Sequence, residues 1–165
     1  MENQKGFTLI ELVIVVTLIL IIAAITIPSL TKSKINANEA SAVGSLRAIT
    51  QAEVSYQAGF GGFANSLANL GGAEPCKSSA ETACLLDESL AGGVKSGYNF
   101  AAVGGNPATE AHTTFVAGAA PLVFDRTGQR LFCTTDKNVI RADLNVGGST
   151  IPPDGQQCAT FKALQ

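Results

Sequence analysis

The stretch Gly6–Leu30, GFTLIELVIVVTLILIIAAITIPSL, decides how the rest of this chain is organised. Fifteen of the residues from Phe7 to Ile27 are Leu, Ile, Val or Phe. About 20 helical residues, each rising ~1.5 Å, span the ~30 Å hydrocarbon core of a bilayer. A single segment exposed to lipid must satisfy its own backbone hydrogen bonds, so we predict a transmembrane helix despite the many β-branched residues.

Glu11 is the single charged residue of this stretch. A central carboxylate costs about 2.5–3.5 kcal/mol on insertion, which the large apolar residues outweigh at ~0.3–0.6 kcal/mol each. The side chain either reaches back to water or is reserved for a partner inside the membrane. If the chain is cut between Gly6 and Phe7, the new α-amino group of Phe7 offers a positive partner on an axially shifted neighbouring copy. Such a pair would neutralise both charges and set the register between copies.

The residues Lys5-Gly6-Phe7-Thr8-Leu9-Ile10-Glu11-Leu12 resemble the class III signal sequence of type IV pilins and type II secretion pseudopilins. The resemblance implies that a prepilin peptidase cleaves after Gly6 and methylates the amino group of Phe7. It implies that Glu11 aligns each incoming subunit in the filament, and Pro28 matches a proline that family members carry at the same distance. It also implies that the leader lies in the cytoplasm and the following domain outside the inner membrane.

A conventional secretory signal is the competing interpretation of this stretch. Such signals have a basic leader, a shorter apolar run and a small-residue cleavage site after it. Here the leader carries both Glu2 and Lys5, and Ala23-Ala24-Ile25 is a poor cleavage site. With Lys32 and Lys34 after the stretch, positive charge is almost balanced across it, so charge alone does not orient the protein.

We expect three segments along the chain: a leader at 1–6, a hydrophobic transmembrane and filament-core helix at 7–30, and a soluble domain at 31–165. Pro28 removes one helical hydrogen bond and crowds the preceding turn. A helical pattern resumes after it, so we expect Pro28 to kink the helix rather than end it. The soluble domain therefore includes the second half of one long helix.

The second half of that helix has one broad apolar face at helical spacing, formed by Ile35, Ala42, Val43, Leu46, Ile49, Val54 and Tyr56. Glu39 and Glu53 fall on this face or at its edge and weaken the pattern. We place the end of the helix near Ala58, with Gly59 as its left-handed cap.

The remaining residues predict a small antiparallel sheet packed on the helix, which makes the fold α+β and pilin-like. A loop with a short helix near Ala64–Leu70 comes first, followed by irregular or short helical structure over residues 73–95. Turn signals then separate five short β-rich runs: Tyr98–Ala102, Thr113–Ala117, Leu122–Phe124, Arg130–Thr135 and Val139–Ala142. From these runs we expect a sheet of three or four strands. Pro152-Pro153-Asp154-Gly155 should break regular structure near the end of the chain.

Four cysteines lie in the predicted soluble domain: Cys76, Cys84, Cys133 and Cys158. An even number in a small exported domain predicts two disulfides, for which three pairings exist. We favour Cys76–Cys84 and Cys133–Cys158, because each pair closes a local loop. No C-x₂-C spacing occurs, which argues against a four-cysteine zinc site.

The sequence carries no constellation typical of an enzyme. His112 is the only histidine, and we expect it at the surface. No Lys/Arg cluster interleaves with aromatic residues, so we predict no nucleic-acid partner. Four aspartates in turns do not match the D-x-[DN]-x-[DN]-G spacing of a calcium loop: Asp125, Asp136, Asp143 and Asp154. Some secretion pseudopilins hold calcium in their terminal loops, so calcium stays open; otherwise we expect no metal and no cofactor.

We therefore predict a structural subunit of a type IV pilus-like filament, which polymerises through its N-terminal helix. Its partners would be further copies of itself, other pilins, the prepilin peptidase, an inner-membrane assembly platform and the membrane. The protein would be a single-pass protein of the bacterial inner membrane before assembly, and part of a periplasmic or cell-surface filament afterwards. Two alternatives stay open: a pseudopilin of a type II secretion system, and a minor tip subunit or anchored module that binds a ligand.

Overall fold

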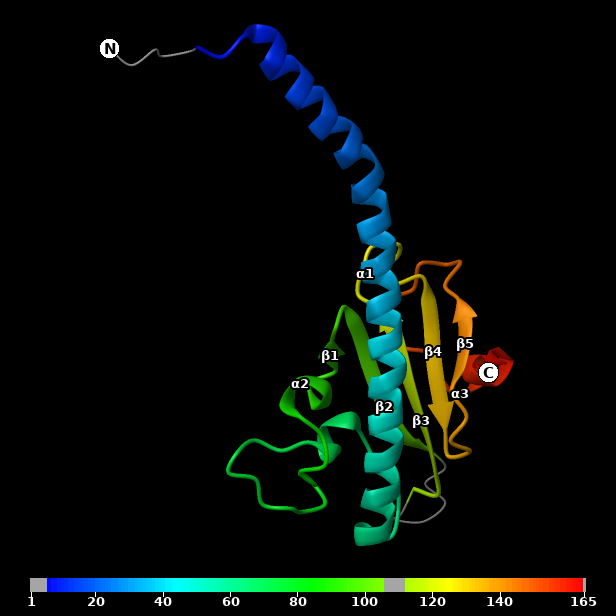
Figure 1. The fold of residues 1–165 in the computed structure, drawn as a ribbon. Helices are drawn as coiled ribbons and strands as arrows, with labels where there is room; N and C mark the ends of the chain where they lie inside the picture. The colour runs from blue at the N-terminus through cyan, green and yellow to red at the C-terminus, as the bar shows by residue number, and fades with distance from the viewer. Residues whose placement is uncertain (1–5, 106–111, 165) are drawn as a thin grey trace. The chain divides into compact units, whose positions relative to one another are not determined.

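The computed structural model describes residues 6–105 and 112–164, and Figure 1 shows the course of the chain. Of the predicted leader, only Gly6 lies within the described residues. The chain divides into two compact parts, Met1–Lys34 and Ile35–Gln165. Helix α1 (Leu9–Phe60) is 52 residues long and contributes to both parts.

The second part contains an antiparallel sheet of six strands, in which each strand pairs with the next one along the chain. The strands are β1 (Val94–Lys95), β2 (Tyr98–Gly105), β3 (Thr114–Pro121), β4 (Arg130–Thr135), β5 (Arg141–Leu144) and β6 (Lys162–Ala163). Three short helices complete the part: η1 (Leu67–Leu70), α2 (Glu88–Ala91) and α3 (Gly155–Thr160). A long N-terminal helix with an antiparallel sheet confirms the predicted α+β class.

The main core lies between α1 and one face of the sheet (Figure 1). Side chains alternate along a strand, so every second residue of β2 and β3 faces the helix. The buried residues that meet there are Ala42, Leu46, Ile49, Ala52 and Tyr56 from α1, and Tyr98, Phe100, Ala102, Phe115, Ala117, Ala119 and Phe132 from the sheet. The small side chains of Ala117 and Ala119 in β3 allow α1 to pack close to the sheet. The aromatic side chains of the neighbouring positions fill the rest of the core.

The C-terminal segment covers part of the opposite face of the sheet. A Cβ at Gly118 in β3 would lie 2.6 Å from the carbonyl oxygen of Pro153, so only glycine allows this close approach. Cys133, the register partner of Gly118, forms a second buried cluster with Cys158 and Phe161. The sheet is therefore enclosed between α1 and the tail that carries α3.

Several boundaries differ from the sequence prediction. Helix α1 ends at Phe60 rather than near Ala58, and Gly61, with φ of +82°, takes the left-handed conformation expected of Gly59. Val54, predicted on the apolar face, is exposed. Helix boundaries are set by local hydrogen bonds, here from the Gly61 N–H to the Gln57 carbonyl at 2.9 Å, which propensity alone does not resolve.

The sheet also differs from the prediction in its strand count and in one run. Leu122–Phe124 is not a strand, because both backbone groups of Val123 bond to Thr127 and close a turn there. Strands β1 and β6 have two residues each, too few for an alternating pattern to be recognised. The Pro152–Gly155 break is followed by α3, whose first turn is capped by the Asp154 side chain.

Glu39, which weakens the apolar pattern in the sequence, bonds α1 to the start of β4 in the structure. Its side chain is only 4% exposed. One oxygen accepts the Gln129 N–H at 2.9 Å, and the other accepts the Arg130 Nε–H at 2.7 Å. The Asn38 amide also donates to the Thr127 carbonyl at 2.9 Å. Burial of the Glu39 carboxylate is tolerated because both of its oxygens accept hydrogen bonds. One of these bonds satisfies a backbone N–H in the loop between β3 and β4, for which the sheet offers no acceptor.

Glu53 holds the segment after the helix in a similar way. The side chain is fully buried, and Oε2 accepts the Ala64 N–H at 2.9 Å. Oε1 has no hydrogen-bond partner within the described residues. Burial raises the pKa of Glu53 from 4.5 to about 7, and the Ala64 N–H opposes this shift only in part.

Glu39→Gln should lower the free energy of unfolding by about 1.5–3 kcal/mol, because hydrogen bonds to charged groups contribute about this much. The substitution keeps the side-chain size but replaces one acceptor with a donor that faces Arg130. Chemical denaturation in detergent measures the change. The matched control is Glu74→Gln at an exposed position, which should stay within about 0.5 kcal/mol of the native protein. Equal effects at the two positions would contradict the role of Glu39.

Glu53→Gln should change how stability depends on pH. Because the folded pKa is raised, the folded state binds the proton more tightly than the unfolded chain between pH 4.5 and about 7. The native protein should therefore lose up to about 3 kcal/mol of stability as pH rises through this window, and the variant should not. Denaturation at a series of pH values tests this. A stability difference between variant and native protein that is independent of pH would count against it.

Candidate assembly site

The predicted cleavage and assembly residues lie at the start of α1. Gly6, Phe7 and Thr8 precede the helix, which begins at Leu9. The Glu11 N–H donates to Thr8 Oγ1 at 3.4 Å, and the Leu12 N–H donates to the Thr8 carbonyl at 3.3 Å. Thr8 therefore caps the helix, and Glu11 stands at the third helical position, the T-x-x-E spacing of a capping box. A carboxylate in this first turn also interacts favourably with the helix dipole.

The Glu11 carboxylate is exposed, and it forms no ion pair with any cation among the described residues. Phe7 is 83% exposed and makes no hydrogen bond to Glu11 in the part of the chain that the structure describes. The structure thus brings Thr8 and Glu11 together but not Phe7 and Glu11.

Gly6 is not required by the packing of this chain. A Cβ at Gly6 would meet nothing within 4 Å. Because Phe7 beside it is also exposed, the peptide bond between the two residues is accessible to another protein. Packing among the described residues therefore does not require glycine at position 6.

We call residues 7–30 the stem, and its large apolar side chains are exposed on every side. Each of them is at least 48% exposed: Phe7, Leu9, Ile10, Leu12, Val13, Ile14, Val15, Val16, Leu18, Ile19, Leu20, Ile21, Ile22, Ile25, Ile27 and Leu30. Among the described residues, α1 is the one helix long and apolar enough to cross a membrane, with a mean hydropathy of 3.0 over 18 residues. Because none of that window is buried, the stem is not the core helix of a soluble domain.

Two threonine hydroxyls of the stem bond to its own backbone. Thr17 donates to the Val13 and Ile14 carbonyls, and Thr26 donates to the Ile22 carbonyl at 2.8 Å. These hydroxyls need no water, as suits an apolar environment. Helix α1 continues through position 28, so Pro28 does not end it; the kink stays a prediction.

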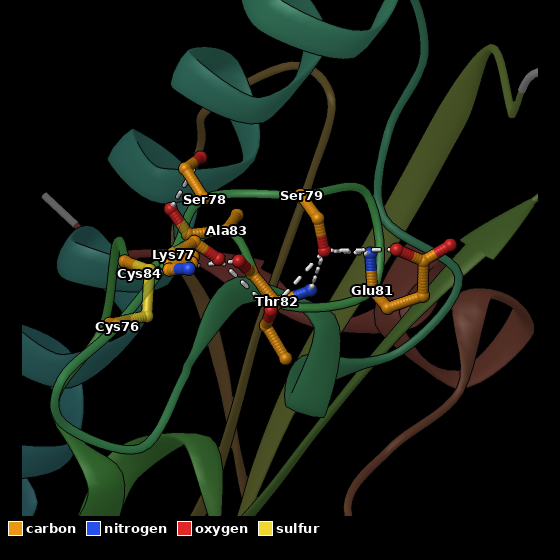
Figure 2. The surroundings of a disulfide bond; sticks show 8 residues. All are labelled: Cys76, Lys77, Ser78, Ser79, Glu81, Thr82, Ala83 and Cys84. Atoms are coloured by element: carbon orange, nitrogen blue, oxygen red, sulfur yellow. Dashed lines mark hydrogen bonds between the residues drawn. A yellow bond between two sulfur atoms is a disulfide. The ribbon is translucent and has the colours of Figure 1, made fainter.

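The structure pairs Cys76 with Cys84 and Cys133 with Cys158, the pairing that the sequence favoured. Figure 2 shows the first disulfide closing a loop in which the Ser79 hydroxyl accepts the N–H groups of Glu81 and Thr82, each at 3.3 Å. The second disulfide joins β4 to α3 and is fully buried. Both bonds lie in the second part of the chain, away from the assembly residues in sequence.

The four aspartates considered for calcium are not gathered into a site. Asp125 accepts from the Gln129 amide, Asp143 accepts the Leu144 N–H, and Asp154 caps α3. Among the residues described, no group of three His, Cys, Asp or Glu side chains could hold a metal ion. The prediction of a surface position for His112 is only partly right. Its ring is half-buried, and a Cβ at Gly104 would lie 2.5 Å from its Cγ.

A groove of about 790 Å³ runs along the second part, between α1 and the turn from β4 to β5. Its lining comprises Val43, Arg47, Thr50, Gln51, Val54, Ser55, Asn138, Val139, Ile140 and Leu164. The groove contains one arginine and no His, Cys, Asp or Glu among these described residues, so its lining offers neither an acid–base pair nor a metal ligand set.

Comparisons with known proteins match about a third of the chain or less. A family profile described as the prokaryotic N-terminal methylation motif matches residues 1–27. The chain is also 42% identical over 57 residues to the type IV wide pilus major component PilA4 of Thermus thermophilus. That match covers 34% of this chain and 44% of the relative, so the chain spans less than half the length of this curated protein. No solved structure matched the chain.

Proposed function

We propose, for a chain that is type IV pilin-like in its N-terminal motif and its fold, that the protein is the structural subunit of a type IV pilus-like filament. The observation that carries the proposal is the juxtaposition at the start of α1. An accessible Gly6–Phe7 bond and a Glu11 without an ion pair among the described residues open a helix whose large apolar side chains are all exposed along the stem. As a pilin-like protein, the chain acts as a structural subunit and not as an enzyme.

The stem supplies the surface through which subunits associate. In the inner membrane, lipid covers its apolar side chains, and association there depends on close packing rather than on the hydrophobic effect. Once the stem leaves the bilayer, the same surface has to be covered by the stems of other copies, because a patch of this size is not stable in water. The helix is thus stable in both places, as a membrane anchor and as part of a filament core.

Charge pairing sets the position of each stem against its neighbour. Cleavage after Gly6 by the prepilin peptidase gives Phe7 a free amino group, which is then methylated and keeps its positive charge. Among apolar side chains, an unpaired Glu11 carboxylate or Phe7 ammonium is costly, and pairing them across two copies removes both costs at once. If one stem shifts along its neighbour and the Glu11–Phe7 pair breaks, both charges are again unpaired among apolar side chains. The axial position that keeps the pair is therefore favoured.

The pilus subunit is favoured over the other candidates by the named relative. PilA4 is described as the major component of a wide pilus, and it shares 42% identity with this chain over the matched 57 residues. A pseudopilin of a type II secretion system would use the same cleavage and the same Glu11 pairing. Long fibres on the cell surface would identify the pilus subunit, whereas a secretion defect without fibres would identify the pseudopilin.

Gly6→Ala, and more completely the bulkier Gly6→Leu, should leave uncleaved precursor in the inner membrane. The fold itself tolerates a side chain there, so the defect would arise in the peptidase. Mass spectrometry of the N-terminus measures the outcome: the native protein should begin at a methylated Phe7. Gly44→Ala is the matched control, because a Cβ there also meets nothing within 4 Å. A normally processed Gly6→Leu protein would overturn the cleavage proposal.

Glu11→Gln should leave membrane insertion and cleavage intact but reduce filament formation about tenfold or more. Each ~1.4 kcal/mol of pairing energy lost between neighbours weakens their association tenfold. Electron microscopy of purified filaments, normalised to the amount of cleaved subunit, measures this. Glu74→Gln, at an exposed carboxylate of the second part, should assemble like the native protein. Normal filaments from the Glu11 variant would show that the carboxylate does not set the register.

A further inference from the structure

The second part of the chain exposes a group of large apolar side chains at one end of its sheet. We call the group the apolar rim; its members are Leu122, Val123, Phe124, Leu144, Val146 and Ile151. Val146 is 88% exposed, Ile151 is 74% exposed and Leu144 is 65% exposed. Scattered exposed apolar residues need no explanation, but a contiguous group is typical of an interaction surface.

Strand register and hydrogen bonds place the members of the rim together. Pro121 pairs with Tyr98, and Leu144 pairs with Arg130, so the loops that follow β3 and β5 leave the sheet at the same end. The Asn145 N–H donates to the Gln129 carbonyl at 3.0 Å and joins the two loops. A Cβ at Gly148 would lie 3.8 Å from that of Phe124. The two loops that carry the rim therefore lie side by side at one end of the sheet (Figure 1).

The loops hold these side chains outward on a fixed backbone. The buried Asn145 side chain donates to the Ser149 carbonyl and accepts the Ser149 N–H, each at 2.8 Å. Thr127 closes the other loop through both backbone groups of Val123. Exposure of the rim is thus a property of the folded loops and not of a frayed end, although it leaves apolar area in water.

The rim lies at the end of the sheet where α1 enters the second part. Asn38 and Glu39 of α1 bond to Thr127 and Gln129, within the loop that carries Phe124. Leu30, the last residue of the stem, is eight positions before Asn38 in the chain. Eight residues reach at most about 28 Å even when fully extended. A membrane that holds Leu30 can therefore be no farther than about 28 Å from Asn38.

The charges near the rim suit the surface of a bilayer. Arg126, in the loop that carries Phe124, is exposed, and a cation next to apolar side chains favours anionic lipid headgroups. Two acids, Asp125 and Asp143, also lie in or beside these loops. Each of them already accepts a local hydrogen bond, from the Gln129 amide and the Leu144 N–H.

We propose that the apolar rim is a membrane-contact surface, which inserts into the interfacial region of the bilayer that anchors the stem before the subunit joins a filament. The proposal rests on the membrane anchoring in the proposed function. Leu122, Phe124, Val146 and Ile151 contribute buried apolar area, and the Arg126 guanidinium contacts lipid phosphates. The contact holds the folded domain against the membrane until assembly withdraws the stem.

Tryptophan fluorescence tests the proposal directly, because the native chain contains no tryptophan. Three full-length variants, Val146→Trp, Lys137→Trp and Leu20→Trp, are reconstituted in vesicles of phosphatidylcholine and phosphatidylglycerol. Brominated acyl chains in these lipids quench any tryptophan that reaches the bilayer. Lys137 is the matched control, since it is exposed at the turn between β4 and β5, at the other end of the sheet.

We expect at least twofold quenching and a blue-shifted emission for Val146→Trp with bromine near the glycerol backbone, and neither effect for Lys137→Trp. Quenching of Leu20→Trp without quenching of Val146→Trp would overturn the rim proposal and leave the anchor intact. No quenching of Leu20→Trp would overturn both. If the Val146→Trp emission shifts only in filaments, the apolar rim contacts a second copy of the chain and not the membrane. Equal quenching of Val146→Trp and Lys137→Trp would show that the rim contacts the membrane no more than the rest of the domain does, and would overturn the proposal.

Discussion

One helix in this chain has to satisfy two different surroundings, and the rest of the structure follows from that constraint. Along the stem, apolar side chains cover every side, and none of its 18-residue apolar window is buried by the described residues. Beyond Ile35 the same helix is amphipathic and packs one face on an antiparallel sheet. A change from all-round to one-sided hydrophobicity within α1 thus separates the segment with exposed apolar side chains from the segment that packs into a core.

Two buried acids show how the second part is held together. Glu39 and Glu53 lie on the apolar face of α1, where hydrophobicity alone would favour leucine. Each accepts a backbone N–H from a connecting segment, Gln129 before β4 and Ala64 before η1. Connecting segments lack the regular partners that strands and helices provide, so a carboxylate on the helix supplies them. The sheet is fixed to the helix by its core, and the loops are fixed by these acids.

Much of the fold could be predicted from the sequence, for reasons that differ between elements. The stem and the alternating run at Tyr98 have strong patterns, one of a long apolar helix and one of a strand. The roles of Glu39 and Glu53 could not be predicted, because an acid on an apolar face is a weak signal until its partner is known. The strand expected at Leu122–Phe124 was wrong, since the hydroxyl of Thr127 closes a turn that apolar composition does not reveal. At the assembly site, the order of residues indicated the chemistry, but the cap formed by Thr8 was missed.

The hydroxyls of Thr17 and Thr26, which bond to the helix that carries them, have a mechanical consequence. Where these threonines lie, the stem offers a neighbour only non-directional dispersion contacts. In the proposed filament, neighbouring stems could then slip along or rotate about one another at little energetic cost. Stiffness against axial sliding would be concentrated at one ionic contact per junction, so a fibre made of such helices could stretch under load and recover its length.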